Sequence, residues 1–326
     1  MRIEPRFLNW GVFFVLLGAI PLAVQGNVID RDVVARAWQL WPLLIIGAGA
    51  GLLLRQTAFN FVGGLIAAAT FGVMFGGLLA VGTDFASFAR SCGSDAASRT
   101  FGSQQGSLSG SAAVTLTFTC GDLTVGTTPG SSWSVSGAAG DGQAPRIDAS
   151  TSRLDVRSRD SNGGIFGFDA RQSWNVSLPQ DPLLDVSVTI NAGTGSLGFA
   201  GAHVGTLSFQ GNAGSATIDL SAVASARRVS VQFNAGSAKV SLPSATLTGD
   251  FQVNAGSISF CVPEGVGLRL TADQNITASN NYADAGLAKN GNAWESANYA
   301  SAANHIDLTT NANAGGFTLN PKEGCR

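Results

Sequence analysis

The sequence predicts a membrane protein in which three N-terminal transmembrane α-helices precede an all-β domain folded as a single-stranded β-solenoid. Two observations lead to this fold class. Long apolar runs free of charged residues fill the first part of the chain, and a short Asn-Ala-Gly phrase recurs every 20 to 22 residues in the second half. We therefore divide the chain into a transmembrane region (1–83), a linker (84–107) and a solenoid domain (108–326).

Three apolar runs have the length that a bilayer demands of a helix. They cover residues 8–24, 37–54 and 58–82, and none contains an acidic or basic residue. A hydrocarbon core needs roughly 17 to 25 such residues. The first run follows two arginines, as a signal peptide would, but no small-residue cleavage pattern closes it. We expect it to be a retained anchor.

The repeated phrase begins at four asparagines and carries a glycine two residues later. These corner residues are Asn191, Gly193, Asn212, Gly214, Asn234, Gly236, Asn254 and Gly256. Periods of about 20 residues are typical of solenoids, in which each coil buries its apolar face by stacking on its neighbours. On both sides of each phrase, apolar and polar residues alternate with period 2, which indicates two strands around a common interior.

A structural corner explains the phrase better than a ligand site does. Glycine permits the backbone angles of a sharp bend, and small neighbours allow successive bends to stack about 4.8 Å apart. Equivalent asparagines could then hydrogen-bond along the stack as a ladder. A calcium-binding ladder would need repeated carboxylates, and the four phrases contain none.

The cysteines bear on topology and on covalent links. Cys92, Cys120, Cys261 and Cys325 all follow the apolar runs, and an even number in a Gly/Ser-rich region fits an oxidising compartment. With three spans, this predicts a multi-pass cell-membrane protein with a cytoplasmic N-terminus and an extracytoplasmic solenoid. Four cysteines allow three connectivities. If residues 275–304 form a surface excursion, the last coil stacks beside the coil that contains Cys261. This favours a disulfide between Cys261 and Cys325, and Cys92 then pairs with Cys120 by elimination.

Composition and motifs exclude several function classes. The net charge of −2 and the absence of a basic cluster argue against a nucleic-acid partner. No phosphate-binding glycine loop or nucleophile elbow occurs, and His203 and His305 lack neighbouring ligands at metal-binding spacing. We therefore expect no catalytic residue, no metal and no cofactor, and the chain is predicted not to be an enzyme.

Two stretches resemble known families. The run "WQLWPLLIIGAGAGLLLR" and its neighbouring spans resemble the LiaI/LiaF-like transmembrane region. From about Leu108 onward, "VTLTFTCGDLTVG" and the "NAGS" units look like bacterial toast-rack domains of the adhesin type. The resemblance implies a bacterial cell-envelope protein with an outward-facing β-solenoid, in a group linked to envelope-stress sensing or surface adhesion. It supplies no functional residues.

The resulting functional prediction is a membrane-anchored envelope protein whose solenoid serves in binding, adhesion or scaffolding. Its expected partners are the lipid bilayer and an envelope glycan or other surface ligand. The first alternative is an accessory regulator of envelope-stress signalling that acts on a membrane signalling protein such as a sensor kinase. The second is a polysaccharide-active β-helix enzyme, which would need clustered carboxylates beside a metal or a basic residue.

Overall fold

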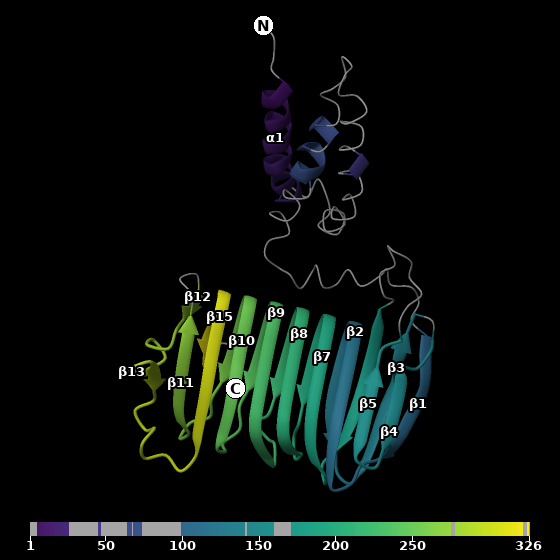
Figure 1. Ribbon diagram of the computed structural model, residues 1–326, viewed down its shortest axis with the longest axis vertical. Coiled ribbons are helices and arrows are strands. Elements are labelled where there is room, and N and C mark those ends of the chain that lie inside the picture. Colours follow the sequence, from purple (N-terminus) through teal and green to yellow (C-terminus); the bar gives the residue numbers. More distant parts are fainter. Residues whose placement is uncertain are drawn as a thin grey trace. The chain divides into compact units, whose positions relative to one another are not determined.

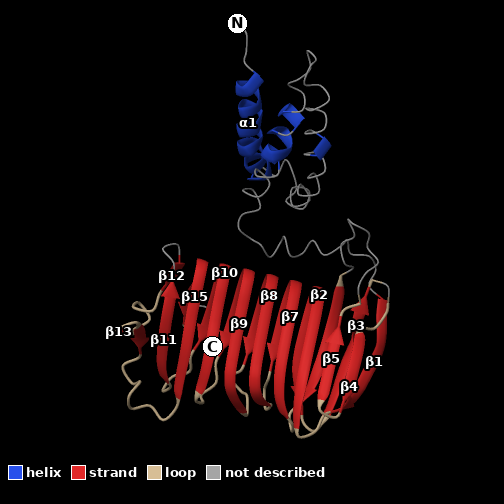
Figure 2. Cartoon of the chain, in the orientation of Figure 1, coloured by secondary structure: helices blue, strands red, loops and turns tan. Residues whose placement is uncertain are grey.

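The computed structural model describes residues 5–25, 45–46, 64–66, 68–73, 99–140, 142–159, 171–274, 278–321 and 325. The chain separates into two compact units, Met1–Ser91 and Cys92–Arg326. In the first unit, helix α1 covers Pro5–Gln25, and residues 45–46, 64–66 and 68–73 are also helical. The second unit is built of β-strands (Figure 2).

The strands of the second unit are numbered in chain order. They are β1 (Arg99–Ser107), β2 (Ser111–Thr128), β3 (Ser132–Ala139), β4 (Arg146–Ser150), β5 (Arg153–Arg157), β6 (Gln172–Pro179), β7 (Leu183–Gly198), β8 (His203–Asp219), β9 (Ser225–Ser241), β10 (Leu247–Cys261), β11 (Gly267–Gln274), β12 (Ala278–Asn280), β13 (Ala288–Asn290), β14 (Ala293–Glu295) and β15 (His305–Leu319).

The prediction of three transmembrane helices and a multi-pass membrane location is wrong. Among the described residues, no helix combines the length and the apolar character needed to cross a membrane. Helix α1 contains polar Asn9 and Gln25, and the apolar stretch between them is shorter than the roughly 20 residues that a hydrocarbon core requires. The predicted spans 37–54 and 58–82 lie mostly outside the described residues. Within them the structure describes 45–46, 64–66 and 68–73, which are helical.

Six long parallel strands form the body of the β unit. β2, β7, β8, β9, β10 and β15 lie side by side in that order, and each pairs with its neighbour over most of its length (Figure 1). Each strand has 15 to 18 residues and contains a bend at its glycine, so it contributes to two walls around one interior. The chain is a β-solenoid over this region.

The interior is apolar because alternate side chains of each strand point into it. On β9, Val231, Phe233 and Val240 are at most 1% exposed, whereas Gln232 and Lys239 between them are partly exposed. This confirms the inward face predicted for that coil. The rings also stack from coil to coil, since the centroids of Phe209 and Phe233 lie 5.4 Å apart.

Five shorter strands, some parallel and some antiparallel to their neighbours, cover the N-terminal end of the stack. β6 runs parallel to the second half of β2, and β3 and then β1 continue outward from it as antiparallel neighbours. Beside the first half of β2 lies β5, which forms a hairpin with β4. Trp174 of β6 packs edge to face against Phe118 of β2, with ring centroids 4.9 Å apart. This end is therefore closed by the antiparallel pairs β1–β3, β3–β6 and β4–β5 rather than by a further regular coil.

The C-terminal end departs from the predicted surface excursion at residues 275–304. β15 inserts between β10 and β11 and runs parallel to both, while β14 and β13 continue beyond β11. Tyr282 is fully buried and donates a hydrogen bond from its hydroxyl to Thr310 at 3.1 Å. The segment closes the end of the apolar core, so only part of it is a surface loop.

Candidate functional site

The repeated glycines form the bend of each coil. Gly193, Gly214, Gly236 and Gly256 have φ angles between 127° and 135°, a region that other residues rarely adopt. A Cβ atom on Gly236 would lie 1.9 Å from the carbonyl oxygen of Gly214, and the other three glycines show the same close approach. Gly121 and Gly315 bend the first and last coils in the same way. The bend therefore requires glycine for both its φ angle and its stacking.

The asparagines of the phrase form the predicted ladder. The donated hydrogen bonds run from Asn212 to Asn191 (2.8 Å), from Asn234 to Asn212 (2.7 Å), from Asn254 to Asn234 (2.8 Å) and from Asn313 to Asn254 (2.7 Å). Asn313 of the last coil was not among the predicted corner residues. Each inner amide donates one N–H and accepts at its oxygen in the ladder, and the oxygens of Asn212 and Asn254 also accept from Gln210 and Gln252, so the second N–H remains for a ligand.

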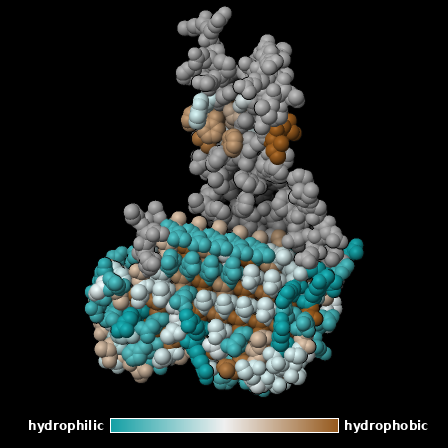
Figure 3. Space-filling model, viewed as in Figure 1, coloured by the Kyte–Doolittle hydropathy of each residue, from teal (hydrophilic) through white to brown (hydrophobic). Residues whose placement is uncertain are grey.

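The wall that precedes the bend carries three polar columns across the strands, which we call the polar face. The first column comprises Thr115, Ser187, Ser208, Ser230, Asp250 and Thr309, the second comprises Thr117, Thr189, Gln210, Gln232, Gln252 and Asn311, and the third comprises the five ladder asparagines. Figure 3 shows these hydrophilic residues in rows that cross the strands. Members of one column repeat at the strand spacing of about 4.8 Å.

The polar face is almost free of charge. Its only ionisable side chain is Asp250, which pairs with Arg228 of the neighbouring strand at 2.7 Å. Both partners of this ion pair are about half exposed, so solvent screens it and it contributes little to stability. These three columns therefore offer hydroxyl and amide groups, which both donate and accept hydrogen bonds, whereas the next column of the same wall carries Asp185, Arg228 and Asp307.

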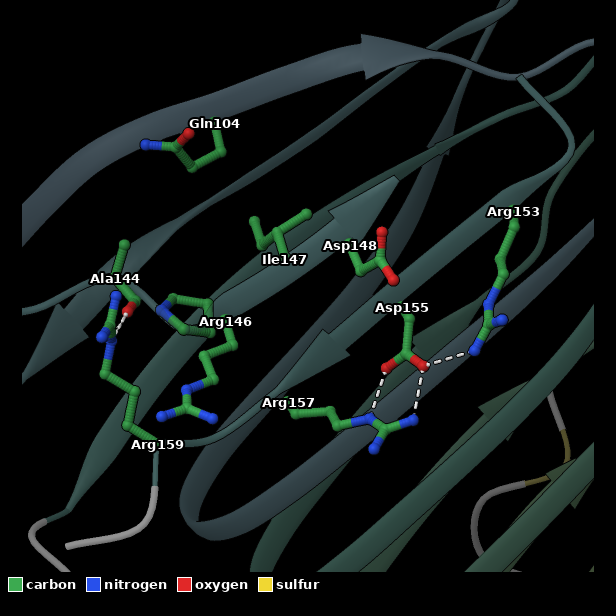
Figure 4. Close-up of a pocket in the computed structure, with 10 residues that line it drawn as sticks. Gln104, Ala144, Arg146, Ile147, Asp148, Arg153, Asp155, Arg157 and Arg159 are labelled. Atoms are coloured by element: carbon green, nitrogen blue, oxygen red, sulfur yellow. Dashed lines mark hydrogen bonds and ion pairs between the residues drawn. The ribbon is translucent and has the colours of Figure 1, made fainter. Parts of the chain in front are cut away.

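A cavity of about 680 Å³ lies beside the β4–β5 hairpin (Figure 4). Four arginines and two aspartates line it: Arg146, Arg153, Arg157, Arg159, Asp148 and Asp155. We call it the arginine cavity. It adjoins the polar face, because Asp155 and Arg157 stand opposite Thr115 and Thr117 in the sheet and so extend the first two columns by one position.

Asp155 organises two of the arginines. Arg157 donates to both of its carboxylate oxygens, at 2.7 Å from Nε and 2.6 Å from Nη2, and Arg153 donates from Nη2 at 3.0 Å. The hydrogen bond from Arg157 lowers the pKa of Asp155, against the opposing effect of burial, and the bond from Arg153 lowers it further. In turn, the hydrogen bond with the Asp155 carboxylate raises the pKa of Arg157. The carboxylate is 5% exposed, so it holds both guanidinium groups in defined positions.

The pairing of β4 with β5 places like charges opposite each other. Arg146 is the register partner of Arg157, and Asp148 is the register partner of Asp155. Such pairs destabilise a hairpin, which normally sets opposite charges face to face. Sequence reasoning missed this site, although Arg153, Asp155, Arg157 and Arg159 alternate with period 2 and so mark one fully charged strand face.

Three of the four cysteines lie among the described residues. Cys261, at the end of β10, forms a disulfide with Cys325, and the Cα atoms are 5.4 Å apart. This is the pair that the stacking order of the last coil predicts. Cys120 is also disulfide-bonded. Its predicted partner, Cys92, lies outside the described residues.

Neither histidine lies in a metal-binding cluster. His203 contacts the hydroxyl of Ser225 through Nδ1 at 3.1 Å, and the His305 ring packs on Tyr299. Within the described ranges, no group of three or more His, Cys, Asp or Glu residues is arranged to hold a metal ion.

Residues 100–243 match the family model for the N-terminal domain of toast_rack, DUF2154. This part of the chain, from β1 to just beyond β9, is thus similar to a toast-rack domain. This agrees with the resemblance seen in the solenoid sequence. The LiaI/LiaF-like transmembrane region has no counterpart among these matches.

Two solved structures resemble this chain. A candidate cell adhesion protein from Clostridium sporogenes is 14% identical, with a TM-score of 0.48, and the similarity covers 67% of this chain and 98% of that one. A candidate adhesin from Bacteroides fragilis is 10% identical, with a TM-score of 0.29, and the similarity covers 68% of this chain and 97% of that one. No curated protein matches the sequence.

Proposed function

We propose that the toast-rack solenoid is a non-catalytic binding module of the adhesin type, and that its polar face attaches to an extended neutral polysaccharide. One observation carries this proposal: hydroxyl and amide side chains stand in register over six consecutive coils with almost no charge among them. Soluble protein surfaces usually mix in charged residues at about a quarter to a third of positions. The polar face has fewer charged residues than that and more hydroxyl and amide groups, which can form hydrogen bonds with a hydroxyl-rich ligand.

The geometry favours a polymer over a small molecule. The columns are straight, and they repeat at the strand spacing of about 4.8 Å, so a chain of similar units can repeat the same contacts on successive coils. Each single contact is weak because it replaces hydrogen bonds to water. Several contacts along one polymer act together, which raises the apparent affinity without any deep pocket.

The ladder reduces the entropic cost of binding. Asn212, Asn234 and Asn254 each donate to one neighbour and accept from another, so their side chains are already ordered before a ligand arrives. Gln210 and Gln252 donate to the ladder residues on their own strands at 3.3 Å and 3.5 Å. Side chains held in this way lose less rotamer freedom on binding than free ones.

Retention of the full chain on insoluble cellulose, chitin and curdlan tests the proposal. We expect retention on at least one of these polymers, and we expect the triple variant Gln210→Ala, Gln232→Ala, Gln252→Ala to lose most of it. The matched control removes three hydroxyls from the wall that follows the bend, Ser196→Ala, Thr217→Ala, Ser259→Ala, and should be retained like the parent. Failure of the parent on all three polymers, or equal losses in both variants, would contradict the proposal.

A further inference from the structure

The arginine cavity contains an unbalanced positive charge. Four guanidinium groups and two carboxylates line it, and one of these carboxylates, Asp155, is already engaged by Arg153 and Arg157. We propose that the cavity is a binding site for an oxyanion, the carboxylate or phosphate group of an acidic ligand. The inference stands apart from the proposed function, because a small anion that cannot span the polar face suffices to test it.

Arg146 carries the first part of the argument. Its side chain lies in an exposed position at the start of β4, and among the described residues no carboxylate lies within ion-pair distance of it. Its register partner across the hairpin is Arg157, another arginine, and in Figure 4 the Arg157 guanidinium is turned toward Asp155 while that of Arg146 points toward the side of Arg159. An anion between these arginines would turn a repulsive cross-strand pair into a bridged one.

The second part is preorganisation. The Arg157 guanidinium uses Nε and Nη2 for Asp155, which leaves Nη1 and its two N–H groups for another acceptor. Arg159 donates from Nε to the carbonyl oxygen of Ala144 at 2.7 Å, so both of its Nη atoms remain available. Planar donors fixed in this way match the two oxygens of a carboxylate or phosphate. The protein has therefore ordered these groups before a ligand binds.

The third part is position within the cavity. Asp148 and Asp155 face each other across the hairpin, and their negative charges exclude an anion from that part of it. The arginine pair lies two residues along each strand, on the side where Arg159 follows β5. Charge therefore directs the oxyanion to the space between Arg146, Arg157 and Arg159.

Calorimetric titration of the full chain at low ionic strength tests the inference, with inorganic phosphate and polygalacturonate as separate probes. We expect at least one probe to bind, and we expect Arg146→Gln to weaken that binding by about tenfold or more, as the loss of a charge-assisted hydrogen bond does. Binding of phosphate identifies a site for small or phosphorylated anions. Binding of polygalacturonate alone identifies a site for acidic glycans.

The control is Arg227→Gln, which removes the same charge from an exposed arginine on β9 and should bind like the parent. Arg146→Lys keeps the charge without the planar fork and should fall between the parent and Arg146→Gln. Protection of Arg146 from phenylglyoxal by the bound probe, measured by peptide mapping on the unaltered chain, provides a readout that needs no variant. The inference is overturned if neither probe binds, if Arg227→Gln loses as much affinity as Arg146→Gln, or if the probe leaves Arg146 unprotected.

Discussion

Asn313 donates a hydrogen bond to the side-chain oxygen of Asn254 at 2.7 Å, although 59 residues separate them in the chain. The three other steps of the ladder join asparagines 20 to 22 residues apart. This step is long because strands β11 to β14 come between β10 and β15 in the sequence, whereas β15 lies directly beside β10 in the sheet. The asparagine ladder therefore follows the order of the strands in the sheet, in which β15 comes directly after β10, and not their order in the sequence.

The ladder should stabilise the fold in proportion to the bonds that each asparagine makes. Asn234→Ala removes two ladder hydrogen bonds and should cost about 2 kcal/mol, because each neutral bond contributes about 1 kcal/mol net. Asn191→Ala removes only one bond, at the end of the ladder, and should cost about half as much. Urea denaturation of both variants measures the difference. Equal costs would show that the ladder does not act through these bonds.

The bend should tolerate no side chain. Gly236→Ala forces alanine into a positive φ of 135° and places its Cβ 1.9 Å from the carbonyl oxygen of Gly214. Strain of this kind costs about 1 to 3 kcal/mol before the clash is counted. Gly126→Ala is the control, because an added Cβ there meets no atom within 4 Å, and it should change the stability by less than about 1 kcal/mol. Comparable thermal melts for the two variants would refute the assigned corner.

The core of the central coils should depend on Phe233. Its side chain is 1% exposed and packs on Phe209, and its ring fills the space that the missing side chain of Gly211 leaves open. Phe233→Ala should cost about 3 to 5 kcal/mol, as other large-to-small core substitutions do. Phe233→Leu keeps most of the volume and should cost clearly less. A near-zero loss for the alanine variant in denaturant melts would contradict the inward face.

The disulfide should stabilise the last coil. Cys261 and Cys325 are 64 residues apart, and the chain-entropy model assigns about 4 kcal/mol to a loop of that length. The variant Cys261→Ser, Cys325→Ser should therefore unfold at a lower urea concentration than the parent. Non-reducing peptide mapping of the parent should recover a Cys261–Cys325 peptide. Recovery of a Cys120–Cys261 peptide instead would contradict the stacking order.

Tyr282 should make stability fall at alkaline pH. Burial raises the pKa of its phenol above the ordinary value of 10.0, against the smaller lowering effect of the hydrogen bond with Thr310. A raised pKa in the folded state means that the stabilisation is complete below the unfolded pKa and is lost as the pH rises above it. Tyr282→Phe should be slightly less stable at pH 8 and should show a shallower loss above about pH 10. Identical alkaline slopes in denaturation experiments would count against a buried phenol.

Local patterns were enough to predict the regular coils. The position of each bend follows from glycine's φ angle, and the inward face follows from period-2 alternation, so Val231, Phe233 and Val240 could be placed without knowledge of distant contacts. The ladder follows from the same register. These features repeat in the sequence because they repeat in space.

Features that depend on distant partners could not be predicted in this way. The burial of Tyr282 results from its position at the end of the stack beside Thr310, in a segment whose own sequence is rich in Asn and Ala. The arginine cavity requires the pairing of Arg146 with Arg157, which no local pattern reveals. The error in the N-terminal region has a different cause, because apolar composition was taken as evidence of helix length.

The central claim is that the polar face binds a neutral polysaccharide, and the side-chain amide resonances of the second column test it most directly. Titration of isotopically labelled full-length protein with cellohexaose and with chitohexaose should shift the NH₂ signals of Gln210, Gln232 and Gln252. The backbone signals of the wall that carries Ser196, Thr217 and Ser259 should stay in place. If neither oligosaccharide moves the three glutamine signals, or if the shifts gather on the opposite wall, the account of this surface is contradicted.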